Sequence, residues 1–171
     1  MRKTAFVLLA MMAFVPSARV RADIVSNCDF SDQPGRQINA CTALLQRKKL
    51  DVAIRAAAHI NRGNAYAAAG KQRLAMTDYA AASKIEPDNH LPYYNRGNVY
   101  FDEKRYAEAI AQYSAAIERE SNFAFSFCNR GVAYRKMGNV SKAIADFRAA
   151  LSIDPAMSNA RENLQLLEGS I

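Results

Sequence analysis

The sequence predicts an all-α solenoid, and three observations support this prediction. The triplet Asn-Arg-Gly occurs at residues 61–63, 95–97 and 129–131, so its copies lie 34 residues apart. Apolar residues around each copy recur at the three- and four-residue spacing of a helix face. Gly70, Gly138, Pro87 and Pro155 fall between these apolar stretches, where helices end. A fixed period of this length is typical of a repeat architecture.

Residues 1–22 predict a secretory signal peptide. A basic start at residues 2–3 precedes an apolar run over residues 4–15, and short side chains lead up to a cleavage position after Ala22. The run is short for a membrane span, which needs about 20 residues. An uncleaved membrane anchor is the alternative. We therefore expect an exported bacterial protein, periplasmic or secreted, with no membrane span in the mature chain.

Residues 23–55 predict an N-terminal cap. Ile38–Leu45 matches the repeat sequence at Ile110–Ile117, so it is expected to be half of a repeat. Because exported proteins meet an oxidising compartment, we expect a Cys28–Cys41 disulfide that pins the leading strand Asp23–Gly35 onto this helix. Closing such a loop is worth about 3 kcal/mol. Cys128 is left over, and it is expected to be a small buried residue rather than a reactive thiol.

Residues 56–157 carry the repeat. Several positions agree at the period of 34, and they combine the glycine of the triplet with aromatic, alanine and proline positions: Tyr66/Tyr100/Tyr134, Ala75/Ala109/Ala143, Tyr79/Tyr113/Phe147, Ala82/Ala116/Ala150 and Pro87/Pro155. This pattern resembles the tetratricopeptide repeat (TPR) family. The resemblance implies a right-handed α-solenoid of three helix-turn-helix units at 56–89, 90–123 and 124–157, followed by a C-terminal capping helix within 158–171.

Each unit has a defined packing pattern. Tyr93, Gly97 and Tyr100 share one helix face, and Gly97 is expected to let the second helix approach, with Ala109 as the small residue facing it. Gly70 and Gly138 are expected to end their helices in the left-handed conformation. The second unit has Lys104 and Arg105 there, which predicts a different turn. The arginine of each triplet is expected to lay its stem on the core and keep its head in water.

Nothing in the sequence predicts an enzyme. There are only two histidines, and His59 takes the position of Tyr93 and Phe127, so we expect it to be an aromatic-sized core residue. His90 lies in a loop. We see no cluster at metal-ligand spacing and no glycine-rich phosphate loop, so no metal and no cofactor is expected.

The charge pattern gives no reason to expect a nucleic-acid partner. The formal net charge is +7, but four of the 23 basic residues lie in residues 1–22. The rest of the sequence has 19 basic and 16 acidic residues, and the two signs are interspersed along it. A basic patch of the kind that binds phosphates is therefore not predicted.

The TPR resemblance implies a concave groove, lined by the first helix of each unit, that binds a protein or peptide segment. Amides of Asn64 and Asn98 are expected to hold a peptide backbone, and aromatic side chains to offer pockets. The alternative is that the aromatics only pack against neighbouring helices. The expected groove residues are Asn64, Leu91, Tyr94, Asn95, Asn98, Phe101, Phe125, Asn129, Arg135 and Lys136, with Ile60, Ala67, Cys128 and Val132 at equivalent positions and Asp102 near the exit.

Some TPR domains clamp a C-terminal carboxylate with lysine, asparagine and arginine. Asn64 and Asn95 match two of the asparagines, but Ile60, Phe125 and Asn129 stand where basic residues are needed, so this clamp is not expected.

Two functions remain open. The favoured one is a non-catalytic scaffold or adaptor of the bacterial cell envelope with a groove ligand. The alternative is a structural solenoid without a groove ligand that self-associates or binds envelope polymer, using a C-terminal helix with Leu164, Leu166 and Leu167. The expected oligomeric state is a monomer or a weak self-associating form.

Overall fold

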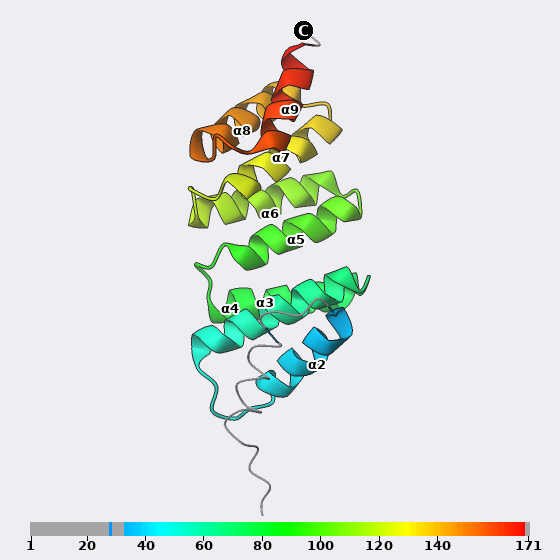
Figure 1. The fold of residues 1–171 in the computed structure, drawn as a ribbon, viewed down its shortest axis with the longest axis vertical. Coiled ribbons are helices and arrows are strands. Elements are labelled where there is room, and N and C mark those ends of the chain that lie inside the picture. Colours follow the sequence, from blue (N-terminus) through cyan, green and yellow to red (C-terminus); the bar gives the residue numbers. More distant parts are fainter. Residues whose placement is uncertain (1–27, 29–32, 170–171) are drawn as a thin grey trace, which may run out of the picture.

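The chain folds into a stack of helices (Figure 1). The computed structural model describes residue 28 and residues 33–169, so the expected signal peptide lies outside the described residues. These described residues form helices and no strand, which confirms the predicted all-α solenoid. The helices are α2 (Pro34–Leu45), α3 (Val52–Ala68), α4 (Gln72–Ile85), α5 (Leu91–Asp102), α6 (Tyr106–Arg119), α7 (Ala124–Lys136), α8 (Val140–Ile153) and α9 (Ser158–Glu168).

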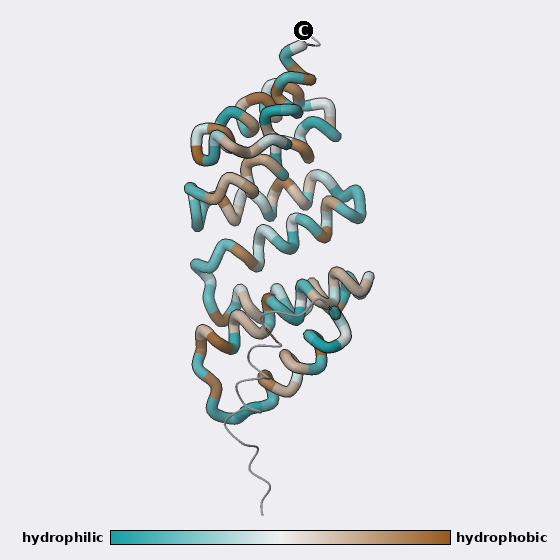
Figure 2. The backbone as a smooth tube through the Cα atoms, viewed as in Figure 1, coloured by the Kyte–Doolittle hydropathy of each residue, from teal (hydrophilic) through white to brown (hydrophobic). Residues whose placement is uncertain are grey.

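Each helix contacts only its near neighbours. Successive helices pack in pairs, and α3 also contacts α5, α5 contacts α7, and α7 contacts α9. This pattern makes the molecule a one-dimensional stack in which the helices α3, α5 and α7 form one continuous layer. Hydrophilic and hydrophobic residues are interspersed along the helices (Figure 2). Within the described part of the chain, no helix has the length and apolar character that a membrane span requires.

An aromatic ring sits directly on the glycine of each triplet. A Cβ atom added to Gly97 would lie 2.5 Å from a ring carbon of Tyr113, which is closer than atoms can pack. The same relation joins Gly63 to Tyr79 at 2.5 Å and Gly131 to Phe147 at 2.9 Å. Gly97 therefore allows the predicted close packing, and the nearest atoms of the second helix belong to the Tyr113 ring.

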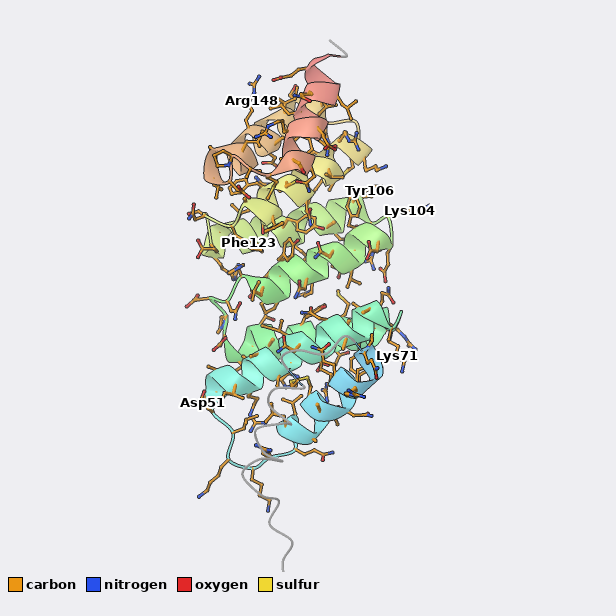
Figure 3. All side chains as sticks on the ribbon, viewed as in Figure 1. Asp51, Lys71, Lys104, Tyr106, Phe123 and Arg148 are labelled. Atoms are coloured by element: carbon orange, nitrogen blue, oxygen red, sulfur yellow. A yellow bond between two sulfur atoms is a disulfide. The ribbon has the colours of Figure 1, made fainter. Side chains whose placement is uncertain are left out.

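The turns inside the three units share one geometry. Gly70 and Gly138 have φ of 71° and 76°, and Lys104 has φ of 60°. In each turn the next amide donates to a carbonyl five residues earlier, as Arg105 does to Tyr100 at 2.9 Å. The prediction of a different turn at Lys104 is therefore wrong. Lys71 and Lys104 mark this edge of the stack in Figure 3. A lysine accepts the strained conformation because the turn satisfies helix-end carbonyls.

The N-terminal helix is held by a disulfide. Cys28 and Cys41 are bonded in the structure, with their Cα atoms 4.7 Å apart, and both side chains are buried with Leu44 and Ala58. The amide of Gln37 donates to the Cys28 carbonyl at 3.0 Å. The predicted leading strand needs one correction, because Pro34 and Gly35 already form the first turn of α2. Except for Cys28 and residue 33, the rest of that segment lies outside the described residues.

The C-terminal helix covers the core of the last unit. Leu164 and Leu167 pack against the buried cluster around Phe147, while Leu166 is 61% exposed. The apolar surface expected from the three leucines is therefore mostly used inside the chain. A terminal repeat needs such a cover because no further unit buries its apolar face. Cys128 lies in the same cluster as a free, fully buried thiol, and burial raises its pKa to about 11.

Replacing Lys104 by glycine should stabilise the fold. The left-handed conformation costs an ordinary residue about 1–2 kcal/mol, and glycine recovers most of this while losing some unfolded-state entropy. We expect Lys104→Gly to raise the free energy of unfolding by about 0.5–1 kcal/mol in urea titrations. Lys104→Ala is the matched control and should gain nothing. Equal stability of the glycine and alanine variants would contradict the explanation.

Candidate functional site

Buried tyrosines and surface asparagines are joined across the layer of first helices. The hydroxyl of Tyr79 donates to Asn64 Oδ1 at 2.8 Å, and the amide of Asn95 donates to the same oxygen at 2.9 Å. The next unit repeats this arrangement. Asn98 Oδ1 accepts from the hydroxyl of Tyr113 at 2.8 Å and from the amide of Asn129 at 3.0 Å. These bonds tie α3 to α5 and α5 to α7, along the line that the groove follows.

The arrangement leaves amide donors for a ligand. A carbonyl oxygen has two lone pairs, so Asn64 Oδ1 and Asn98 Oδ1 are each fully used by two donors. The NH₂ group of Asn64 has no hydrogen-bond partner among the described residues, whereas the amide of Asn98 also hydrogen-bonds the hydroxyl of Tyr94, which uses one of its two N–H donors. Asn64 is exposed and Asn98 half-buried. The groove therefore presents two primary amides as donors, held in place from behind by their own oxygens.

Sequence reasoning did not find the role of the tyrosine hydroxyls, although the sequence carries a signal for it. The first two units have the pairs Asn64/Tyr79 and Asn98/Tyr113. The third unit has Val132 and Phe147 at these positions. The hydroxyl and the amide that it would meet are thus lost together. Comparing the units with one another would have indicated that the two positions touch.

A pocket of about 340 Å³ opens beside this network, between α5, α6 and α7. It is lined by Asn98, Phe101, Asp102, Tyr113, Asn129 and Val132. Phe101 and Val132 give it apolar walls. Asp102 is exposed at the end of α5 and brings a carboxylate to the rim.

The groove aromatics also pack against each other. The Tyr94 ring lies 5.9 Å from that of Tyr113 and 5.1 Å from that of Phe123, which in turn lies 5.5 Å from Phe125. The hydroxyl of Tyr94 accepts a bond from the Asn129 amide at 3.1 Å. Burial raises the pKa of this hydroxyl, which keeps it neutral. Tyr94 therefore packs against aromatic residues of neighbouring segments, as the alternative prediction had it, while Phe125 is 50% exposed. The ring of Phe123, which is labelled in Figure 3, contacts both Tyr94 and Phe125.

The predicted groove residues divide into three groups. Asn98, Phe101 and Asn129 line the pocket, and Tyr94 supports it from the side. Asn64 and Asn95 form the neighbouring part of the same line. Outside the pocket lining are the half-buried Leu91, the exposed Phe125, and the basic pair Arg135 and Lys136 in the last turn of α7.

Two equivalent positions are not on the surface at all. Ile60 is 6% exposed and Cys128 is fully buried, so neither faces a ligand. Cys128 packs in the buried cluster that contains Phe147 of α8.

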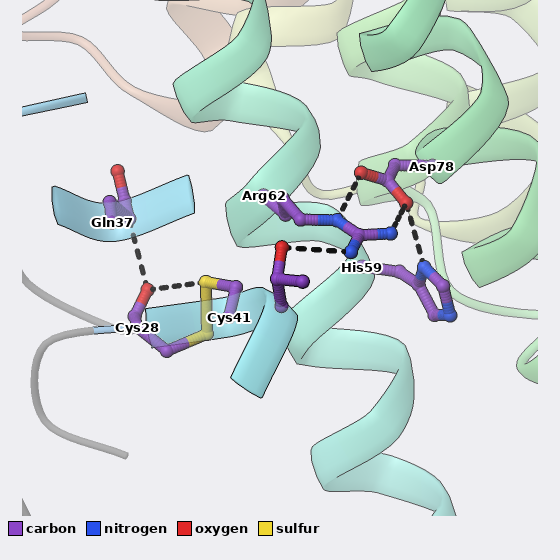
Figure 4. Close-up of a disulfide and its surroundings, with 7 residues drawn as sticks. Cys28, Gln37, Cys41, His59, Arg62 and Asp78 are labelled. Carbon is purple, nitrogen blue, oxygen red and sulfur yellow. Dashed lines mark hydrogen bonds and ion pairs between the residues drawn. A yellow bond between two sulfur atoms is a disulfide. The ribbon is translucent and has the colours of Figure 1, made fainter. Parts of the chain in front are cut away.

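A second polar network lies on the other side of the first helices (Figure 4). Arg62 donates two hydrogen bonds of 2.8 Å to the Asp78 carboxylate, one from Nε and one from Nη2. Its Nη1 donates to the Thr42 hydroxyl at 3.1 Å. His59 Nδ1 lies 2.8 Å from Asp78 Oδ1. The Arg62 side chain is 19% exposed and that of Asp78 only 4%. Arg62 thus links α2, α3 and α4.

The third unit repeats the arginine network. Arg130 binds Asp146 through two bonds of 2.8 Å and donates to Ser114 at 2.9 Å. Two predictions are therefore wrong. The heads of Arg62 and Arg130 are not in water, because a carboxylate on the second helix pairs with them. His59 is not a plain core residue, because it is bound to the same carboxylate as Arg62.

Comparisons with known proteins agree with the observed architecture. The family model described as TPR repeat matches residues 63–103 and 97–138, and that described as tetratricopeptide repeat matches residues 124–157. Together they span more than half of the chain. Among curated proteins, no match is found.

Solved structures similar to the chain are helical repeat domains of low sequence identity. MamA 41-end from Desulfovibrio magneticus RS-1 is 20% identical, with a TM-score of 0.73. The match covers 89% of this chain and 84% of the MamA chain. The second TPR domain of human RPAP3, in complex with the HSP70 peptide SGPTIEEVD, is 25% identical, with a TM-score of 0.64, covering 69% and 98%. The N-terminal domain of stress-induced protein-1 from C. elegans is 25% identical, with a TM-score of 0.63, covering 70% and 99%.

Removing the Asp78 carboxylate should destabilise the fold in a pH-dependent way. Burial opposes its ionisation, but hydrogen bonds from Arg62 and His59 outweigh burial and hold the pKa of Asp78 below its usual value. Because the pKa of Asp78 is lower in the folded chain, its ionised carboxylate raises the free energy of unfolding at every pH above the pKa of an unfolded aspartate, about 3.9. This contribution is lost as the pH falls through the folded pKa. We expect Asp78→Asn to cost about 3 kcal/mol at neutral pH, measured by urea unfolding.

The difference in the free energy of unfolding between wild type and Asp78→Asn should shrink towards zero in acid, once the Asp78 carboxylate is protonated in both the folded and the unfolded chain. Asp88→Asn is the control, because Asp88 is exposed and forms no ion pair with any residue that the structure describes. A cost that stays constant down to the acid limit would show that the ion pair is not its source.

Proposed function

The chain belongs to the tetratricopeptide repeat family, and we propose that it is a non-catalytic scaffold that binds a protein or peptide segment in the groove along α3, α5 and α7. One observation carries the proposal. Asn64 offers its NH₂ group and Asn98 offers the N–H that is not bonded to Tyr94, since the side-chain oxygens of both residues are already bound within the chain. An extended peptide offers unpaired backbone carbonyls, which are the acceptors that these donors need.

The pocket supports a ligand with an apolar side chain and a neutral or basic neighbour. Phe101 and Val132 give apolar contact, and Asp102 at the rim favours a positive charge over a negative one. Fixed donors and a rigid pocket reduce the entropy lost on binding. The groove therefore offers peptide-backbone recognition at two points and side-chain recognition at one.

The solved relatives support peptide binding without naming the ligand. The second TPR domain of human RPAP3 was solved with the HSP70 peptide SGPTIEEVD, and that peptide ends in acidic residues. This chain has Ile60, Phe125 and Asn129 where an acidic terminus would need basic side chains, and Ile60 is buried. We propose that its peptide differs from the acidic tail of that complex.

The double variant Asn64→Asp/Asn98→Asp tests the groove. An aspartate keeps the oxygen that accepts from the tyrosine and the neighbouring asparagine, so the fold should be retained. It replaces each outward NH₂ group by an acceptor that repels a peptide carbonyl. We expect this variant to lose the partners that residues 23–171 capture from an envelope extract, as identified by mass spectrometry. Losing the two hydrogen bonds from the asparagine amides to peptide carbonyls would weaken binding by about 2 kcal/mol or more.

The control carries the same chemical change outside the groove. Asn139→Asp/Asn159→Asp alters two exposed residues near the starts of α8 and α9. It should capture the same partners as wild type. If both double variants capture equally, the groove is not the binding surface.

We further propose that the scaffold acts in the bacterial cell envelope, after export. The pattern of residues 1–22 supports this proposal, and a Cys28–Cys41 disulfide fits an oxidising compartment. A scaffold there would meet partners outside the cytoplasm.

Expression of the full chain in a bacterium tests export. We expect the mature protein to begin at Asp23, by mass spectrometry, and to occur in the periplasm or medium. Unfolding it without reductant should expose one thiol per chain, that of Cys128. Ala22→Asp is the control, because a charged residue at the cleavage position should block processing. An unprocessed chain in the cytoplasm, with three free thiols, would contradict the proposal.

A further inference from the structure

The middle unit has the same arginine as its neighbours but lacks both of its partners. Arg62 and Arg130 each bind an aspartate on the following helix and a hydroxyl on the preceding one. Gln112 lies 34 residues after Asp78 and 34 before Asp146, and Ala80 lies 34 residues before Ser114. A carboxylate is thus replaced by a neutral amide, and a hydroxyl by a methyl group. Arg96 has neither of the acceptors that hold the other two arginines.

Arg96 is consequently unpaired within the described part of the chain. Its Nε atom is buried and has no hydrogen-bond partner, and Gln112 Oε1 is also buried without a partner. No ion pair and no aromatic ring engages the Arg96 guanidinium among the described residues. The Arg96 residue is half-buried, and a buried N–H of a charged group without an acceptor is costly, so a negative group that reached it would bind favourably.

An open pocket of about 530 Å³ lies in front of Arg96. It is lined by Met76, Thr77, Ala80, Ala81 and Lys84 from α4 and by Arg96 from α5. No acidic side chain lines it, and Lys84 adds a second positive charge. None of these residues lines the groove pocket beside Asn98, so this is a separate site. The methyl group of Ala80 leaves open the space that the Ser114 hydroxyl takes in the next unit.

We propose that Arg96 and Lys84 form a binding site for a carboxylate, supplied by an aspartate or glutamate side chain of a protein partner. The other two units show the geometry that fits. In both, a carboxylate accepts two parallel bonds of 2.8 Å from the arginine. A bidentate arginine–carboxylate pair is directional as well as strong. The apolar walls of Met76 and Ala81 suit the stem of such a side chain better than a fully hydrated small ion.

The site does not depend on the proposed groove function, and it can be tested with a simple probe. We would titrate the capped peptide acetyl-AADA-amide into the mature chain and follow the ¹H–¹⁵N signal of Arg96 Nε, assigned with Arg96→Lys. We expect a dissociation constant on the order of 1 mM, which is weak but measurable. The peptide acetyl-AANA-amide has the same size without the charge, and it should leave the signal unchanged.

A carboxylate placed inside the chain should compete with the probe. Gln112→Asp gives Arg96 the partner that Arg62 and Arg130 have, so we expect binding of the AADA peptide to weaken about tenfold or more. Gln112→Asn shortens the side chain equally but adds no charge, and it should bind as wild type does. Lys84→Met should weaken binding roughly threefold, the size of one surface ion pair. Asn64→Asp/Asn98→Asp should have no effect here.

Three results would overturn the proposal. Equal signal changes with the AADA and AANA peptides would show that the charge is not recognised. Unchanged binding in Gln112→Asp would show that Arg96 is not the site. Acetate binding as tightly as the AADA peptide would show that the ligand is a free small carboxylate and not a partner's side chain.

Discussion

The contact of an aromatic ring with a glycine backbone is the constraint on which this structure depends. The rings of Tyr79, Tyr113 and Phe147 lie where a Cβ atom of the facing glycine would be. This contact fixes how closely the two helices of a unit approach, and hence the register of every other side chain between them. In the first two units the ring also carries a hydroxyl through to the opposite surface, where it holds an asparagine. The core contact therefore positions the groove.

Three neighbouring residues serve three different contacts. Successive residues on a helix point about 100° apart. Within one triplet, Gly131 meets the ring, Arg130 meets a carboxylate on the second helix, and Asn129 reaches back to the preceding first helix. The asparagine and, through its bond to Ser114, the arginine therefore both tie the unit to the preceding one. A solenoid needs such ties, because each unit is stabilised by the ones next to it.

The units are not equivalent, and the differences are where function is expected. The groove donors come from the first and second units, while the third contributes Val132 and Phe147. The arginine ties are complete in the first and third units, while the second leaves Arg96 open. A repeat whose polar positions vary in this way offers chemically different surfaces on its two sides.

The sequence alone determined the fold of this protein, because a 34-residue period, glycines at close contacts and helix-ending residues are all local signals. It also placed Asn98, Phe101 and Asn129 on one surface. Only the tertiary structure decided which groups meet. Arg62 and Asp78 are 16 residues apart and His59 looks apolar by position, so their pairing depends on how two helices are rotated against each other. Lys104 adopts a glycine-like turn because the hydrogen bonds of the helix end outweigh its local preference. Burial of Ile60 and Cys128, one position from the groove, likewise depends on helix rotation, which spacing alone does not fix.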